Sequence, residues 1–262
     1  MTQSEPLVLV KQVQRICRVT LNRPRVFNAL NDALILELQR IFDALRSDTV
    51  TRVVIVEGAG GNFSSGADMA FLSANAPTIE AFRLLQHVKH LLETMRDIPQ
   101  PLVCKVEGVA YGAGANLALT CDFVISADTA RFCEVFVNIG AGLDCGGTYF
   151  LPRLVGLSKA RELALLGNEI DGQTAARLSL IYRSVPQAEL ESAVTALTTT
   201  LAHKSLLALS AIKHGLDKSF EMSLSEVLDW EASQQTVLLQ SQEHKAAVRH
   251  FLESRNASPK GE

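Results

Sequence analysis

The chain has 262 residues, of which 47% are hydrophobic and 20% charged, and its formal net charge is −3. This composition is typical of a globular protein and excludes a disordered chain. The near balance of 25 basic and 28 acidic residues excludes a general nucleic-acid-binding surface.

Strand-like and helix-like segments alternate in the first half of the chain. Residues 7–10 and 16–21 have the pattern of strands, and Asn31 and Asp32 are candidate caps for a helix that extends to residue 45. Further strands are expected at residues 53–57, 102–107 and 123–127, with helices at residues 78–96 and 113–120. Because strand, strand and helix recur about every 50 residues, the pattern predicts an α/β fold built from repeating units.

Helical periodicity dominates the second half. Helices are expected at residues 160–166, 174–178, 189–201, 205–218 and 224–255, and only residues 180–185 have the pattern of an extended segment. We therefore expect a mixed α/β core over residues 1–200 and a helical C-terminal region over residues 201–262.

The cysteines and the N-terminus indicate the compartment. The five cysteines are scattered without a Cys-x-x-Cys pair, which favours neither a disulfide framework nor a metal site. The N-terminus lacks the basic and apolar segments of a signal peptide, and no apolar stretch reaches the roughly 20 residues of a membrane helix. We expect a reduced, cytoplasmic protein that binds neither a metal nor a membrane.

Three glycine-rich stretches carry the clearest functional signal. They are GGNFSSGADM at residues 60–69, GVAYGAGANL at 108–117 and GAGLDCGGT at 140–148. Glycine lets a backbone approach a ligand closely, and amides at a helix start, such as that of Ala113, are unpaired. None of the three stretches completes a nucleophile elbow, a dinucleotide fingerprint or a P-loop. Each of them alone reads as a tight turn or a close packing contact.

Together with other blocks, these stretches resemble the crotonase (enoyl-CoA hydratase/isomerase) superfamily. The blocks are LNRPRVFNAL at residues 21–30, FSSGADM at 63–69, LALTCD at 117–122, GGT with LPRLVG at 146–156, and FLESR at 251–255. The resemblance implies a spiral of repeated ββα units that holds an acyl-CoA site, followed by helices used for oligomerisation. It also implies a homotrimer or a dimer of trimers.

The resemblance implies roles for particular residues. The backbone amides of Ala67 and Ala113 would form an oxyanion hole for the thioester oxygen of an acyl-CoA. Coenzyme A would enter only as part of the substrate, with no separate cofactor. Residues expected to contact it are Arg25, Ser64, Ser65, Gly66 and Asp68, with Arg255 or Lys260 as further partners for its phosphates. For the basic residues, ordinary surface solvation is an equal alternative.

The chain departs from the family at the two glutamates that its hydratases use. The resemblance places Asn116 and Phe136 at those positions. Asn116 cannot take a proton at neutral pH, and Phe136 can neither form a hydrogen bond nor ionise. Asp144 is the candidate replacement, because several family isomerases carry a working aspartate there and a single carboxylate suffices to move a double bond. It needs apolar surroundings that raise its pKa. The alternative is that Asp144 only caps a helix that begins near Gly146.

Glu134 is the rival acid, since on an extended segment it would share a face with Phe136. We therefore expect an acyl-CoA isomerase with Asp144 as the acid/base. The alternatives are an enoyl-CoA hydratase that uses Asp144 or Glu134, and a non-catalytic acyl-CoA-binding protein.

Overall fold

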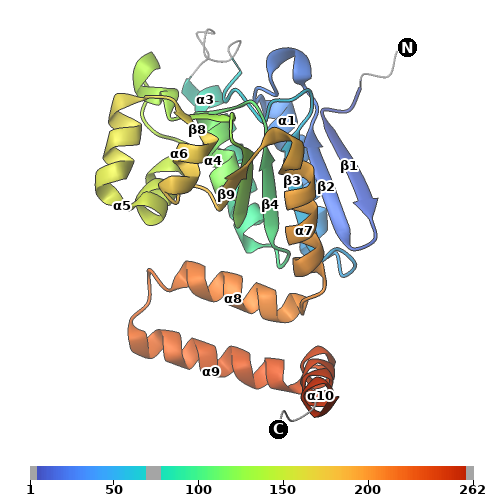
Figure 1. Cartoon of the computed structure of the whole chain (residues 1–262). Helices are drawn as coiled ribbons and strands as arrows, with labels where there is room; N and C mark the ends of the chain where they lie inside the picture. Colours follow the sequence, from blue (N-terminus) through green and yellow to red (C-terminus); the bar gives the residue numbers. More distant parts are fainter. Residues whose placement is uncertain (1–4, 69–77, 258–262) are drawn as a thin grey trace. The chain divides into compact units, whose positions relative to one another are not determined.

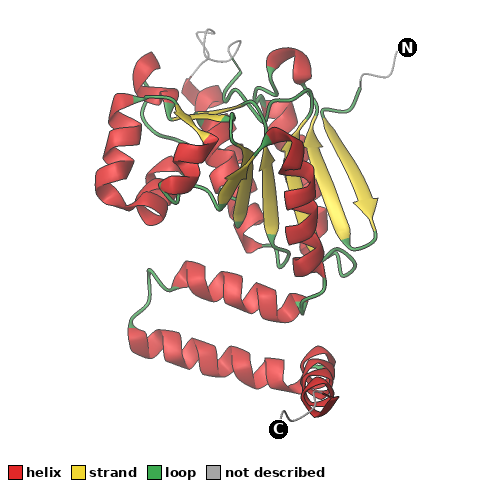
Figure 2. Ribbon diagram, viewed as in Figure 1, coloured by secondary structure: helices red, strands yellow, loops and turns green. Residues whose placement is uncertain are grey.

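A computed structural model describes residues 5–68 and 78–257 of the chain. The chain divides into two compact units, Met1–Ala202 and His203–Glu262 (Figure 1). The first unit is a mixed α/β structure and the second consists of helices (Figure 2).

A six-stranded sheet forms the centre of the first unit. Its strands lie in the order β1-β2-β3-β4-β6-β9, and only β1 is antiparallel to its neighbour. The strands are β1 (Val8–Val13), β2 (Ile16–Leu21), β3 (Val53–Gly58), β4 (Leu102–Val106), β6 (Phe123–Ala127) and β9 (Arg183–Val185). Strand β3 has apolar residues on both faces because helices cover both sides of a parallel sheet.

A smaller sheet lies beside the first and was not predicted. It contains β5 (Val109–Tyr111), β7 (Arg131–Cys133) and β8 (Ile170–Asp171), in that order. These strands have only two or three residues, which is too short to produce a readable alternation. They matter because β5 leads into the second glycine-rich stretch and β7 leads to Glu134.

Helices cover both faces of the large sheet. Helices α1 (Asp32–Arg46) and α3 (Thr78–Asp97) pack together on one face, and α7 (Leu190–Ala202) lies on the other (Figure 1). Helix α1 begins as predicted, because the Asn31 side chain accepts a hydrogen bond of 3.0 Å from the Leu34 amide. Its apolar face is fully buried, with Leu34, Leu38 and Phe42 at most 1% exposed.

The other helical segments described in this unit are mostly short. They are η1 (Pro24–Val26), α4 (Ala113–Leu119), η2 (Val135–Ile139), α5 (Gly147–Leu166), α6 (Gly172–Arg177) and η3 (Gln187–Glu189). Helix α5 begins well before the predicted residue 160, and Gly156 interrupts it with φ of 73°. A proline at residue 152 and this non-helical glycine hide the helical period from the sequence.

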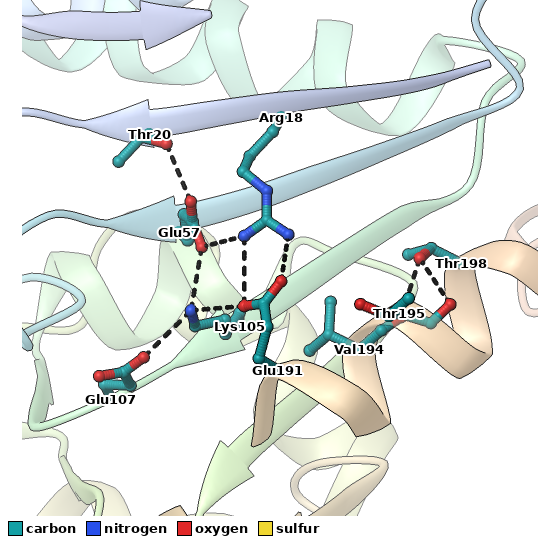
Figure 3. Close-up of polar contacts among 9 residues, drawn as sticks. All are labelled: Arg18, Thr20, Glu57, Lys105, Glu107, Glu191, Val194, Thr195 and Thr198. Carbon is teal, nitrogen blue, oxygen red and sulfur yellow. Dashed lines mark hydrogen bonds and ion pairs between the residues drawn. The ribbon is translucent and has the colours of Figure 1, made fainter. Parts of the chain in front are cut away.

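A cluster of charged side chains, here called the sheet cluster, connects α7 to the large sheet. It consists of Arg18, Glu57, Lys105, Glu107 and Glu191 (Figure 3). Glu191 from α7 lies 2.5 Å from Arg18 and 2.9 Å from Lys105. Both cations also reach Glu57, which accepts a third bond from Thr20 at 3.0 Å. Every carboxylate in the sheet cluster is therefore paired with a cation.

The second unit contains α8 (Leu206–Lys218), α9 (Leu224–Gln240) and α10 (Gln242–Ala257). Ser205 caps α8, and Ser223 with Glu226 forms a capping box at α9. The predicted single run over residues 224–255 is wrong: Ser241 adopts an extended conformation and separates two helices. No helix in the described residues is both long and apolar enough to cross a bilayer.

Candidate active site

The first glycine-rich stretch runs between two segments that bond to it from opposite sides. Ser64 pairs with Ala110 of β5, and Ala67 pairs with Leu30. The Leu30 amide donates to the Gly66 carbonyl at 2.7 Å, and the Asp68 amide donates to the Leu30 carbonyl at 2.9 Å. The Gly66 carbonyl and the Ala67 N–H belong to the same peptide group and point in opposite directions. Because this carbonyl faces Leu30, the Ala67 N–H points away from Leu30. It has no hydrogen-bond partner among the described residues.

The Ala113 amide lies at the start of α4, directly after Gly112. Gly112 has φ of 49° and ψ of −120°, and it starts α4 without a side-chain cap. The first bond inside the helix is donated by the Asn116 amide to the Gly112 carbonyl. The Ala113 N–H therefore remains without a partner in the described part of the chain, as expected for the first residue of a helix.

Gly66 brings the segment of Ala67 against the start of α4. A Cβ atom added at Gly66 would lie 2.6 Å from the Tyr111 carbonyl oxygen and 3.5 Å from the Ala113 nitrogen. Gly114 makes a similar approach, because a Cβ there would lie 2.7 Å from the Ser64 Cβ atom. Two glycines thus place the candidate amides in one region of the molecule.

The residues expected to contact CoA differ in burial and in the bonds that their side chains already form. Ser64 is fully buried, and its hydroxyl donates to the Asn28 carbonyl at 2.9 Å, so this hydroxyl is engaged inside the protein. Ser65 is half-buried and its hydroxyl bonds the Val26 carbonyl, which places it beside the turn that carries exposed Arg25. Asp68 forms an ion pair of 2.8 Å with Arg23. Lys260 lies outside the described residues, as does the side chain of Arg255.

Asn28 organises these loops and had no predicted role. Its side-chain oxygen accepts from the Arg23 amide, and its side-chain nitrogen donates to the carbonyls of Ala59 and Asn62. Its own backbone has φ of 55°, a conformation that asparagine tolerates better than most residues. The only sequence signal was its place in the family block at residues 21–30, which does not reveal a role.

Asn116 connects the two candidate acids. Its Nδ2 atom donates to a Glu134 carboxylate oxygen at 3.3 Å and to the Asp144 main-chain carbonyl at 2.9 Å. Asn116 is fully buried. A Cβ at Gly147 would lie 2.6 Å from that nitrogen, so the Gly-Gly start of α5 makes room for it. The structure thus brings together Asn116, Glu134 and Asp144, which the sequence had only nominated separately.

Asp144 lies in the loop between η2 and α5. Its Oδ1 atom is buried and has no hydrogen-bond partner among the described residues. Burial raises the pKa of Asp144, while a hydrogen bond with Cys145 opposes the rise. The alternative that its side chain caps α5 is wrong, because Gly146 is the cap residue and no side-chain bond is formed there.

Glu134 is the more deeply buried acid, with 5% of its surface exposed. Burial raises its pKa to about 7, and the charge of Asp144 adds to the rise while the Asn116 bond opposes it. The expected extended segment is wrong, because β7 ends at Cys133 and Phe136 lies in the 3-10 helix η2. The two side chains therefore do not follow strand alternation.

Phe136 forms an apolar wall at the start of α4. Its side chain is buried, and a Cβ at Gly112 would lie 3.5 Å from its ring. An aromatic ring beside unpaired amides and carboxyls lowers the local polarity, which favours the protonated form of nearby acids. The described residues contain no group of three acidic, histidine or cysteine side chains arranged to hold a metal ion.

Comparison with known proteins identifies the family of the chain. The sequence matches the family model described as enoyl-CoA hydratase/isomerase over residues 11–261. The chain belongs to the enoyl-CoA hydratase/isomerase family. The resemblance read from the sequence is therefore confirmed, and so is the crotonase-type fold.

Relatives within the enoyl-CoA hydratase/isomerase family carry different activities in their names. A probable enoyl-CoA hydratase of Rhodobacter capsulatus is 37% identical over 90% of this chain and 91% of its own length. A 1,2-epoxyphenylacetyl-CoA isomerase of Escherichia coli is 33% identical over 92% and 93%. A crystal structure of an enoyl-CoA hydratase from Bacillus anthracis covers 98% of this chain and 100% of its own, with a TM-score of 0.91 and 28% identity.

Proposed function

We propose that the protein is an acyl-CoA isomerase that moves a carbon–carbon double bond by proton transfer. The observation that carries this proposal is the position of Asp144. Its carboxyl is buried, has an oxygen without a partner among the described residues, and has a raised pKa. The family resemblance, in addition, places Asn116 and Phe136 at the positions of the two hydratase glutamates. A single base in apolar surroundings fits a reaction that removes a proton and returns it.

In the proposed reaction the carboxylate of Asp144 takes a proton from the carbon next to the thioester of a 3-enoyl-CoA. The electron pair of that C–H bond moves into the conjugated system, and negative charge develops on the thioester oxygen. The amides of Ala67 and Ala113 stabilise this oxygen by hydrogen bonds. Asp144 then returns its proton to the carbon at the far end of the former double bond, which leaves a 2-enoyl-CoA. The reaction needs no separate cofactor.

Support for the amide pair comes from the packing at Gly66 and from the absence of hydrogen-bond partners for both N–H groups among the described residues. For the CoA portion, Arg25 and Ser65 offer the accessible side chains next to this segment. Gly66 and Ser64 would contribute backbone and packing, and Asp68 would hold Arg23 in place.

A hydratase is the second candidate function. Glu134, with a pKa raised to about 7, has the proton affinity of a general acid or base, and the relative from Rhodobacter capsulatus is named a probable enoyl-CoA hydratase. In that case Glu134 or Asp144 would activate water for addition to a 2-enoyl-CoA.

Parallel assays distinguish these functions. The purified protein is given a 3-enoyl-CoA and a 2-enoyl-CoA, and products are separated by chromatography. Conversion of the 3-enoyl to the 2-enoyl ester supports the isomerase, whereas formation of a 3-hydroxyacyl-CoA as the faster reaction contradicts it and supports the hydratase. Tight acyl-CoA binding without turnover over a broad panel contradicts both and indicates a binding protein.

We also propose that the helical unit forms a homotrimer or a dimer of trimers, in line with the family resemblance. Within this unit, a groove of about 540 Å³ lies between α8 and α9, lined by Leu216, Leu228 and Trp230 among others. Leu224 and Val237 are 74% and 68% exposed, which is unusual for side chains that stay in water. Analytical ultracentrifugation tests the proposal, and a monomer at micromolar concentration contradicts it.

A further inference from the structure

Glu134 is a buried acid whose charge no cation balances. In the described part of the chain, neither Glu134 nor Asp144 has an arginine, lysine or histidine within ion-pair distance. Among the residues that the structure describes, the only hydrogen-bond donor that reaches the Glu134 carboxylate is the Asn116 amide at 3.3 Å. An isolated buried carboxylate is costly, so a group of this kind needs a reason other than stability.

The same Asn116 amide holds the backbone of Asp144. Because its two N–H groups bond Glu134 and the Asp144 carbonyl, one rigid side chain spans the two acids. Asn116 is itself fixed by burial and by its place on α4, three residues after the Ala113 amide. The separation of the two acids is thus set by the same helix that presents the proposed oxyanion hole.

Few other titratable groups act on Glu134. Those nearby are Asp144, the thiol of Cys133 on β7 and the thiol of Cys145 before α5, and burial raises the pKa of both thiols, so they stay neutral. Glu134 also lines a cavity of about 10 Å³, whose other lining residues carry no charge, among them Ala115 and Leu119 from α4, Leu163 from α5 and Asn168. The charge that Glu134 senses is therefore mainly that of Asp144.

We propose that Glu134 is a positioning residue that controls the basicity of Asp144: when Glu134 is ionised, its negative charge makes Asp144 bind a proton more strongly. Asn116 links the Glu134 carboxylate to the main chain of Asp144, which keeps the two residues close together. Two interacting acids titrate as a pair, so the active site has a weaker base while Glu134 is protonated and a stronger base once it is ionised. This inference rests on the proposed role of Asp144 as the base.

The inference predicts a second step in the pH profile of the wild-type enzyme. Above the midpoint of Glu134, at about pH 7, kcat should rise again by about three- to ten-fold, because a stronger base removes the substrate proton faster. Glu134→Gln keeps the shape and the Asn116 contact but cannot ionise. We expect the kcat profile of this variant to lose the upper step.

The experiment measures kcat and KM of a 3-enoyl-CoA from pH 5 to pH 9 for the wild type, Glu134→Gln and the matched control Glu162→Gln. Glu162 is an exposed glutamate on α5 that pairs with Lys159, so its variant should keep both steps. If kcat of Glu134→Gln is lower than that of the wild type by the same factor at every pH, the substitution causes only a structural defect and the inference is overturned. The inference is also overturned if the kcat profile of Glu134→Gln retains the upper step.

Carbon-13 NMR of labelled carboxyl groups tests the coupling without any turnover. The signal of Asp144 should show two inflections in the wild type, one of which coincides with the titration of Glu134. In Glu134→Gln that inflection should be absent and the other inflection of Asp144 should stay in place, because glutamine is neutral like the protonated Glu134. If the protein proves to be no isomerase but shows this pattern, the proposed function fails and the coupling stands. An Asp144 titration that is single-step in the wild type overturns the inference even if the variant does not fold.

Discussion

Two groups of carboxylates in this molecule are placed in opposite electrostatic surroundings. In the sheet cluster of Figure 3, Glu57, Glu107 and Glu191 each lie beside Arg18 or Lys105. Hydrogen bonds to the two cations hold the pKa of Glu191 below its usual value against the effect of burial. At the candidate active site, Glu134 and Asp144 have no cation beside them in the described residues, and their pKa values are raised.

This difference in charge pairing indicates different roles for the two groups of carboxylates. Paired charges attach α7 to the sheet, and the lowered pKa of Glu191 keeps that carboxylate ionised at neutral pH. Unpaired carboxyls that face an amide and an apolar wall are destabilising for the fold but suited to proton transfer. In the proposed function, the amides of Ala67 and Ala113 would supply the positive counterpart, by binding negative charge that develops on the substrate.

The largest effect is expected from Asp144→Asn, which removes the proposed base while keeping its shape. The variant should lower kcat of the isomerisation by about 10²- to 10⁴-fold and leave the Kd of a CoA ester nearly unchanged. Steady-state kinetics and calorimetric titration measure the two quantities. A variant with near-native kcat would show that the unpaired carboxyl of Asp144 is not the base.

The second-largest loss of kcat is expected from Gly66→Ala, which disturbs the proposed oxyanion hole instead of the carboxyls. The added Cβ would meet the Tyr111 carbonyl at 2.6 Å, so the Ala67 segment must move away from α4. Loss of one oxyanion donor typically costs about 10²- to 10³-fold in kcat.

Gly61→Ala is the matched control for this variant. Gly61 also has a positive φ, 74° against 91° at Gly66, but a Cβ there meets nothing within 4 Å. Both variants carry the backbone strain of an alanine at positive φ, and only Gly66→Ala should lose turnover. Equal losses of kcat would contradict the assignment of the oxyanion hole.

The two carboxylate groups should also change stability in opposite directions with pH. Because the pKa of Glu134 is raised to about 7 in the folded state, the folded protein holds this proton more tightly than the unfolded chain. Its contribution to the free energy of unfolding should therefore fall between about pH 4.5 and pH 7, by on the order of 2–3 kcal/mol, and stay constant above that range. Denaturant unfolding of the wild type and Glu134→Gln measures this difference, and parallel pH curves would contradict it.

The smallest effect is expected from Glu191→Gln. The pKa of Glu191 is lowered in the folded state, so its stabilising effect is present above the pKa of the unfolded chain and is lost as the pH falls. Because the Glu191 side chain is 54% exposed, the variant should cost at most about 1 kcal/mol at pH 7, and less at high salt. Glu189→Gln, at an exposed neighbouring position, serves as the control. A loss that persists at pH 3 would show that the cost is not electrostatic.

Sequence patterns predicted the long elements well and the short ones poorly. Strand β2 and strand β6 have the predicted bounds, and α1 has the predicted cap, because alternation, helical period and capping are local properties. The small sheet and the turn η2 were not predicted, since two- to five-residue elements carry no period and depend on tertiary contacts.

The candidate site, too, was predicted only in part from the sequence. The glycines that let Ala67 approach Ala113 were visible in the sequence, and Asp144 was recognised through a family resemblance. The sequence did not show that Asn116 joins Glu134 to Asp144, because Asn116 is 18 and 28 residues away from them and the contact depends on where η2 and α5 pack. The pairing of Arg18 with Glu191, 173 residues away, was equally hidden.

A crystal structure of the protein with a non-reactive acyl-CoA tests the central claim most directly. The account predicts that the thioester oxygen lies within about 2.7–3.1 Å of both the Ala67 and Ala113 nitrogens. It also predicts that the Asp144 carboxylate lies nearer than Glu134 to the carbon next to the thioester. A thioester oxygen bound away from these two amides, or an Asp144 side chain that points away from the acyl chain, would contradict it.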